Sequence, residues 1–269
     1  MTYSLLAMTT TPFHYSCGSS FVTIIDYRNS IFGSQVFLVA QGIYCALFGS
    51  SMAFFSIHYI YRYFVSFGSP LLETFHSWRI SYWLMLPLCY AIIWFVTGYI
   101  LCAPNKITDM HIGPHVLEDF GLKLGEYTYV GPYFYPKDMN GKTYVNWVQL
   151  GGMTAVSSTL MVSFATIVYF GLKCYNNMTK LTKQNTMSDR NRELQSQIFY
   201  ALVAQTSIPI ILMHIPVSIL FGATFLDVDL GPMSGIVSMT IAFFPAIDPL
   251  PTIFIIKSYR KALICTFDL

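Results

Sequence analysis

Five long stretches of this chain are almost free of charge, and they constrain its fold more than any other feature. They are Ser34–Ile57, Ile80–Ala103, Thr143–Leu172, Ser196–Leu226 and Leu230–Ile256. The first three contain no Asp, Glu, Lys, Arg or His, while the fourth contains only His214 and the fifth only Asp248. Each is long enough to cross a bilayer, which takes about 20 apolar residues. Because lipid cannot hydrogen-bond the backbone, and the runs lack the alternation of barrel strands, each should form a helix.

The composition also indicates a membrane protein. Only 10% of the 269 residues are charged, whereas soluble domains average about 25%. With 54% hydrophobic residues, too few charged side chains remain to solvate the surface, so lipid must cover part of it. The net charge of +2 gives no field that would attract nucleic acid. We therefore predict one all-α transmembrane domain over residues 1–269, a helical bundle with five complete transmembrane helices.

The distribution of Lys and Arg predicts the orientation, because cytoplasmic loops carry the excess of these residues. The segments Met1–Gly33, Pro104–Lys142 and Asp227–Asp229 contain five basic residues, whereas the alternate segments contain ten. We therefore expect the N-terminus outside the cell and the C-terminus in the cytoplasm. The predicted loops are an outer, turn-rich lid over 104–142, a basic inner loop over 173–195 and a cytoplasmic tail over 257–269.

The sequence offers no motif for catalysis or metal binding. It contains no HExxH, GxSxG or P-loop pattern and no CxxC pair, so we predict neither an enzyme nor a bound metal or cofactor. His111 and His115 have the spacing of a metal pair, but we expect Gly113-Pro114 between them to break the helix. Cys17 and Cys102 could form an extracellular disulfide, although two free thiols are the favoured alternative.

Several motifs resemble one known family. They are HYIYRYF at His58–Phe64, GPYFYPKDMNGK at Gly131–Lys142, ELQSQI at Glu193–Ile198, ALVAQT at Ala201–Thr206, MHIPV at Met213–Val217 and FFPAIDPLPTIFIIKSYRKAL at Phe243–Leu263. Over nearly the whole chain they resemble the nematode serpentine chemoreceptors of the Str type, which are seven-transmembrane receptors. The resemblance implies an olfactory-type G-protein-coupled receptor in the plasma membrane of sensory cilia of chemosensory neurons. Its partners would be a small odorant-like ligand, a heterotrimeric G protein and the lipid bilayer.

The chain departs from this family in its number of spans. Its first full span precedes Tyr61-Arg62-Tyr63, an element that closes the third helix in the family. The five runs would thus correspond to helices three to seven, and Met1–Thr11 to the end of the second helix. Either the chain is a truncated product, or it is a reduced protein that no longer signals. Other readings are a five-span transporter or channel, and a receptor remnant that only associates with other receptors.

Four residues are candidates for activation and G-protein coupling. They are Arg62, Asp248, Tyr259 and Arg260. By resemblance, Arg62 matches the Arg that such receptors use at the G-protein interface, and the alternative is an anchor at the inner headgroups. Asp248 is the only acid in any span, and a carboxylate at that depth needs a partner, a proton or a water-filled cavity.

Prolines in the last two spans should bend their helices, because proline removes a backbone donor and clashes with the preceding turn. Pro245 and Pro249 surround Asp248, where a kink is suited to a switch, with a satisfied structural kink as the alternative. Pro209 and Pro216 surround His214 in the same way.

Polar residues in the outer halves of the spans are candidates for ligand contact. They are Gln41, Tyr44, Gln149, His214 and Ser218. A lone histidine in a membrane is more often a packing residue with one hydrogen bond, so this alternative stays open for His214. Gly49 and the pair Gly151-Gly152 should permit close approach of neighbouring helices.

Overall fold

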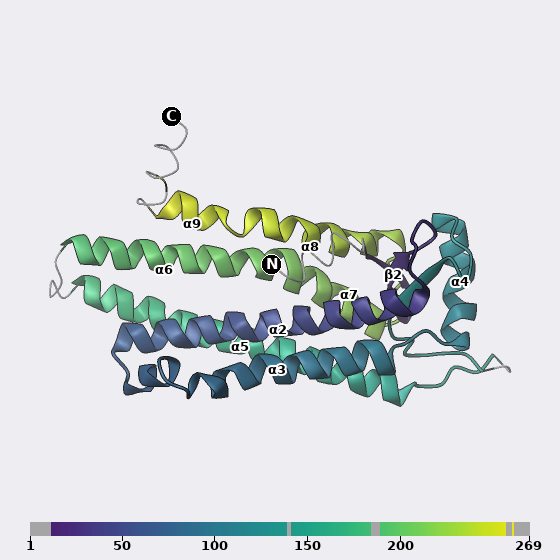
Figure 1. Cartoon of the computed structure of the whole chain (residues 1–269), viewed down its shortest axis with the longest axis horizontal. Coiled ribbons are helices and arrows are strands. Elements are labelled where there is room, and N and C mark those ends of the chain that lie inside the picture. Colours follow the sequence, from purple (N-terminus) through teal and green to yellow (C-terminus); the bar gives the residue numbers. More distant parts are fainter. Residues whose placement is uncertain (1–11, 139–140, 184–188, 257–259, 261–269) are drawn as a thin grey trace.

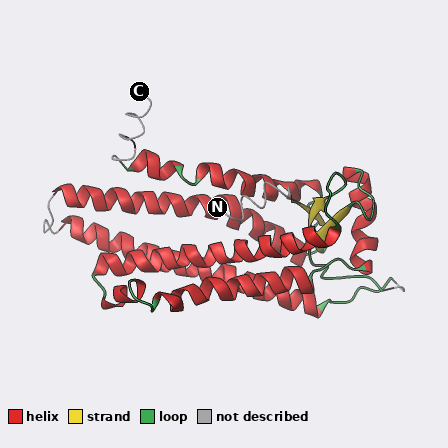
Figure 2. Ribbon diagram, viewed as in Figure 1, coloured by secondary structure: helices red, strands yellow, loops and turns green. Residues whose placement is uncertain are grey.

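The computed structural model describes residues 12–138, 141–183, 189–256 and 260. Most of these residues are helical, the long helices run along the longest axis of the molecule, and a small sheet lies at one end (Figures 1 and 2). The longer helical segments are α2 (Ser34–Phe67), α3 (Ile80–Phe95), α4 (Lys106–Phe120), α5 (Trp147–Lys183), α6 (Asp189–Pro209), α7 (Ile215–Phe225), α8 (Ile236–Ile247) and α9 (Leu250–Ile255). Shorter ones are η1 (Pro70–Phe75), η2 (Val96–Leu101), η3 (Ile210–His214) and η4 (Pro232–Gly235).

Four helices of the described chain are long and apolar enough to cross a membrane. They are Ser34–Phe67, Ile80–Leu101, Trp147–Asn177 and Ser207–Phe225. The prediction of five complete membrane helices is not confirmed, because the last apolar run is divided into α8 and α9 at Asp248-Pro249. Pro249 and Pro251 have no backbone N–H, so two helical hydrogen bonds are lost where the helix stops.

A three-stranded antiparallel sheet corrects the expectation of an all-α protein. Its strands are β1 (Phe13–Cys17), β2 (Ser20–Asp26) and β3 (Tyr127–Val130), in the order β1-β2-β3. Cys17 pairs with Ser20 around the two-residue turn Gly18-Ser19. Gly18 has φ of 54°, a conformation that costs a glycine nothing. The sheet joins the N-terminal segment to the predicted outer lid, so both lie at the same end of the bundle.

Side chains alternate between the two faces of the sheet, and both faces are buried. One face packs on α4 through Tyr15, Val22, Ile24 and Tyr129, against Ile112 and Val116 of the helix. Two phenols fix α4 in place: Tyr15 Oη donates to Asp119 Oδ2 at 2.7 Å, and Tyr129 Oη donates to Asp109 Oδ1 at 2.7 Å. The other face covers the end of the helical bundle. We call β1, β2, β3 and α4 together the cap.

The helix α4 continues through Gly113-Pro114, so the expectation of a break there is wrong. Ile112 and Val116 are completely buried against the sheet, and this packing outweighs the hydrogen bond that Pro114 cannot make. The rings of His111 and His115 consequently lie 6.3 Å apart. Among the described residues, no group of three or more His, Cys, Asp and Glu side chains is placed to hold a metal ion.

The helices pack around one core in which Trp94 is central. Its members include Phe48, Met52, Trp94, Leu160, Val217 and Ile241, from five different helices. Trp94 Nε1 donates to Thr159 Oγ1 at 3.0 Å, which satisfies its only polar group. A Cβ on Gly49 would lie 2.4 Å from Trp94 Cδ1, and one on Gly152 would lie 2.7 Å from Leu101 Cδ1. Both glycines therefore permit close helix packing, as expected, whereas Gly151 faces open space.

The Gly49→Ala variant should be destabilised, because the added methyl group overlaps the buried ring of Trp94. Overpacking of this kind costs about 1–3 kcal/mol. Thermal unfolding of the purified chain in detergent should show a lower Tm than that of the parent. The matched control is Gly151→Ala, which should be neutral or slightly stabilising. Equal Tm values for the two variants would show that Gly49 is not a packing position.

Candidate ligand-binding site

A small cavity of about 60 Å³ lies between the sheet and the bundle. It is lined by Phe21, Thr23, Cys45, Trp94, Thr97, Gly98, Cys102, Val130, Gly131, Pro132, Met153, Val156 and Phe221. Strands β2 and β3 form its roof, and α2, α3, η2, α5 and α7 supply its walls. We call this space the cap cavity.

The lining of the cap cavity contains no charged residue. Its polar groups are the hydroxyls of Thr23 and Thr97 and the thiols of Cys45 and Cys102, beside apolar and aromatic side chains. The structure leaves both Cys17 and Cys102 as free thiols, so their pairing is not observed. Pockets with an apolar lining and few polar groups are typical of small-molecule sites. This one suits a small, uncharged ligand.

The π-helical segment η2 shapes one wall of the cap cavity. Cys102 N–H donates to Thr97 O, five residues back, at 2.9 Å, so the turn holds one residue more than an α-helix. Thr97 and Gly98 come from this widened turn. Single π turns inside α-helices often occur at functional sites.

The motif that starts at Gly131 closes the roof. A Cβ on Gly131 would lie 2.0 Å from Phe21 O, so only glycine fits where the chain passes β2. Ser20 Oγ donates to Pro132 O at 3.0 Å, and the ring of Phe134 stacks on that of Phe225 at 4.6 Å. The motif therefore fastens the hairpin to α7, a role that its sequence alone did not reveal.

Two of the five predicted ligand contacts hold the cap on the bundle. Gln41 is buried, and its Nε2 donates to Thr23 O at 2.6 Å. Gln149 is buried between Tyr133 N–H, which donates to its Oε1 at 2.8 Å, and Leu101 O, which accepts from its Nε2 at 3.1 Å. Both amides therefore bind backbone groups of other elements.

The other three predicted contacts lie on α2, η3 and α7. Tyr44 is buried in the bundle core, next to Cys45 of the cavity wall. His214 is buried, and its Nδ1 lies 3.1 Å from Pro209 O. Ser218 is on the exposed side of α7. None of the five predicted contacts lines the cap cavity.

The predicted bends lie at two places in the last helices. Pro209 ends α6 and Pro216 lies in the first turn of α7, on either side of the π-helical segment η3. Asp248 is half-buried where α8 gives way to α9, with Pro249 beside it. Pro245 belongs to α8, and its side chain lies outside the described residues.

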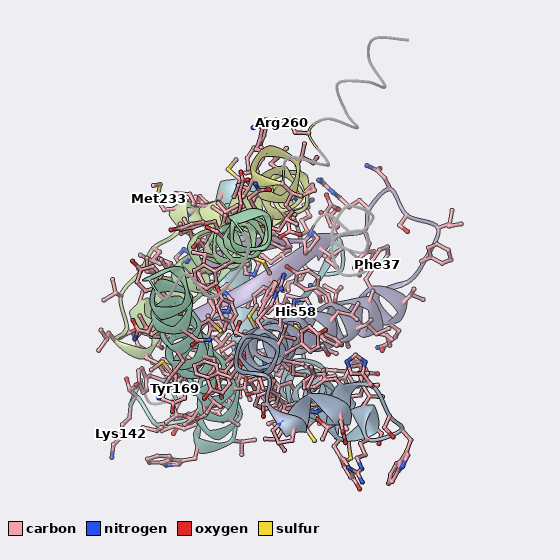
Figure 3. All side chains as sticks on the ribbon, turned by 90° about the vertical axis from the view of Figure 1, so that its left-hand side faces the viewer. Phe37, His58, Lys142, Tyr169, Met233 and Arg260 are labelled. Atoms are coloured by element: carbon pink, nitrogen blue, oxygen red, sulfur yellow. The ribbon has the colours of Figure 1, made fainter. Side chains whose placement is uncertain are left out.

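Two of the predicted coupling residues, Arg62 and Arg260, lie at the opposite end of the bundle. Arg62 is half-buried near the end of α2. Arg260 is exposed, and Figure 3, viewed from this end, shows it at the rim of the molecule while His58 lies nearer the centre. Tyr259 lies outside the described residues, as do Met1–Thr11 and most of the predicted tail.

His14 of β1 connects the cap to the last helices and was missed by sequence reasoning. Ser238 Oγ lies 2.8 Å from His14 N and 2.7 Å from its Nδ1. Burial lowers the pKa of His14 from 6.5 to about 4, so the ring is neutral at pH 7. Because Ser238 accepts from the backbone N–H, its own proton can go to Nδ1. Ser234 Oγ also donates to His14 O at 3.2 Å.

Comparison with known proteins gives a consistent result. The family model for the serpentine type 7TM GPCR chemoreceptor Str matches residues 1–264. The chain is 37% identical to "G-protein coupled receptor str-217" of Caenorhabditis elegans, with 98% of this chain and 75% of that protein aligned. It is 29% identical to "Serpentine receptor class r-10" of Caenorhabditis briggsae, over 91% of this chain and 71% of the relative. The chain therefore belongs to the Str family of serpentine chemoreceptors, which are chemosensory G-protein-coupled receptors of the membrane.

Proposed function

We propose that this chemoreceptor binds a small, uncharged odorant in the cap cavity. The observation that carries the proposal is a lining from two strands and five helical segments, free of charged side chains. A ligand in the cap cavity would contact several helices at the same time, because the walls of the cavity belong to separate helices. The hydroxyls of Thr23 and Thr97 would orient a carbonyl or hydroxyl group of the ligand.

The cap cavity has a direct route to the last helices. Phe21 of the roof stacks on Phe221 of α7, with ring centroids 5.0 Å apart, and both rings line the cavity. From Phe221 the chain leads back to η3 and α6, while His14 ties the hairpin to α8. We infer that a ligand shifts α7 and α8, and that η3 and the Asp248-Pro249 break absorb the movement, with His214 beside the first of these.

The opposite end would engage a heterotrimeric G protein. Arg62 and Arg260 lie there, and the basic inner segment 173–195 and Tyr259 would add further cationic and hydrogen-bonding groups. Arginine is well suited to binding carbonyls and carboxylates of a partner, because its guanidinium carries five donors in a fixed plane. A receptor remnant that only associates with other receptors would show no ligand-dependent nucleotide exchange, which separates it from this proposal. A transporter is not favoured by the family.

The cap is proposed to face the outside of the cell. Segments 12–33 and 104–130 share one sheet, so they lie on the same side of the membrane. They contain fewer basic residues than the loops of the other side, as expected for segments outside the cell. The plasma membrane of sensory cilia is the proposed location.

Filling the cap cavity should abolish the response. Val156→Phe adds a ring to a space of about 60 Å³ and should weaken the ligand-evoked signal at least about tenfold, as steric exclusion from a pocket does. The measurement is G-protein activation in cells exposed to small ketones, alcohols and esters, normalised to receptor at the surface. Val162→Phe, on the exposed side of the same helix, is the matched control and should respond normally. An undiminished response of Val156→Phe would place the ligand elsewhere.

Removing the charge of Arg62 should uncouple the receptor without affecting its ligand. In Arg62→Gln, ligand-stimulated nucleotide exchange should fall about tenfold, the loss expected for one contact worth about 1.4 kcal/mol. Arg79→Gln serves as control, since Arg79 is an exposed base of the same side. If Arg62→Gln and Arg79→Gln exchange nucleotide equally well, Arg62 is only a membrane anchor.

Labelling of intact cells tests the orientation. A membrane-impermeant maleimide should react with a cysteine at Lys123→Cys, in the loop after α4, but not with one at Arg79→Cys, before α3. The reverse pattern would put the cap in the cytoplasm. The parent chain, which has an exposed Cys89 of its own, gives the background.

A further inference from the structure

A second, larger cavity lies between the cap and the start of α2. Its volume is about 380 Å³, and it is bounded by the start of α2, the start of α4, the loop after α4 and β3. The residues that line it include Tyr27, Gln35, Asp109, Leu124, Tyr127 and Tyr129. None of its lining residues belongs to the cap cavity. We call this space the tyrosine cavity.

Asp109 and the tyrosines give this cavity its chemical character. Tyr129 Oη donates to Asp109 Oδ1 at 2.7 Å, which holds the carboxylate in one orientation. Tyr127 is 5% exposed, and its hydroxyl has no hydrogen-bond partner in the described part of the protein. Burial and the nearby charge of Asp109 raise the pKa of Tyr127 to about 12, so the hydroxyl stays neutral.

The charge balance around the cavity favours a cation. Asp109 is the only charged residue in its lining. Across the described residues, the one salt bridge observed joins Arg28 to Asp26, so no base neutralises Asp109. The cap-side segments 12–33, 104–142 and 227–231 contain eight acidic and five basic residues, although the whole chain has a net charge of +2. A negative surface of this kind concentrates small cations near the cavity.

We propose that the tyrosine cavity binds a small organic cation, a primary or secondary amine in its protonated form. Its N–H groups would donate to the Asp109 carboxylate, which Tyr129 holds in place. The half-buried ring of Tyr27 would attract the positive charge and pack on the attached carbon chain. This site is separate from the cap cavity, so it does not depend on the proposed odorant site.

A structural role for Asp109 is the alternative. An acid in the first turn of a helix stabilises the N-terminus, and Asp109 also anchors Tyr129. Asp119 provides a matched comparison, because it lies on the same helix and accepts from Tyr15 Oη at the same distance of 2.7 Å. It does not line the tyrosine cavity. An effect seen at Asp109 but not at Asp119 therefore reports the cavity.

The experiment measures binding of phenethylammonium to the purified full chain in lipid nanodiscs, by the ligand-dependent increase in Tm. The uncharged comparison compound is 2-phenylethanol. Phenethylammonium should raise the Tm saturably, and 2-phenylethanol should not do so at the same concentrations. In Asp109→Asn, which still accepts from Tyr129, the affinity should fall at least about tenfold, whereas Asp119→Asn should stay within about twofold of the parent.

The comparison of phenethylammonium with 2-phenylethanol uses the parent chain, so it tests the proposal even if Asp109→Asn fails to fold. Equal binding of the amine and the alcohol would overturn the proposal, as would equal losses in Asp109→Asn and Asp119→Asn. So would full affinity in Asp109→Asn.

Discussion

The pairing of β2 with β3 is the constraint on which the ligand end of this protein depends. Strand β2 lies between α4 and the helical bundle, so its side chains pack alternately on one or the other. Inside lipid, helices satisfy their own backbone groups, but a strand cannot do so alone. The sheet can therefore exist only beyond the membrane or covered by protein. Here α4 covers one face and the helix ends cover the other, and the cap cavity is the space left between them.

Buried polar side chains connect these layers in pairs of matched groups. Gln41 reaches the backbone of β2, Gln149 joins the loop after β3 to the end of η2, and His14 meets Ser238. The two glutamines place amide groups that would be costly to bury alone against backbone groups that need a partner, and His14 and Ser238 pair two side chains. The cap is thus held by directional contacts at a few defined points, with apolar packing filling the intervening space. Such contacts specify one arrangement of cap and helices more strongly than apolar packing alone.

Most of the helical bundle could be predicted from the sequence, because an apolar run of about 20 residues without charge is long enough to cross a bilayer. Inside lipid such a run satisfies its backbone hydrogen bonds as a helix. The close helix contacts at Gly49 and Gly152 were also predictable from residue size. The hairpin was missed although Gly18-Ser19 separates two runs rich in strand-forming residues, a recognised hairpin pattern.

The continuity of α4 across Pro114 could not be predicted from the local sequence, since it depends on packing against a strand from another part of the chain. The cavity lining was beyond sequence reasoning for a related reason: Val156 toward the cavity and Val162 toward the exterior are the same residue type. The sequence instead favoured polar residues as ligand contacts, and two of these, Gln41 and Gln149, bind backbone groups.

The two π-helical turns have a geometric consequence for the helices that carry them. An α-helix advances by about 100° of rotation for each residue, so a turn that holds one extra residue stores that rotation. If η3 regained α-helical hydrogen bonding, α7 would rotate by about 100° relative to α6, and Phe221 would leave the face that stacks on Phe21. The same change in η2 would carry Thr97 and Gly98 out of the cavity wall. Each π-helical turn therefore fixes the rotation of the helix that follows it. Loss of the one extra residue from the turn would change which side chains face the ligand end.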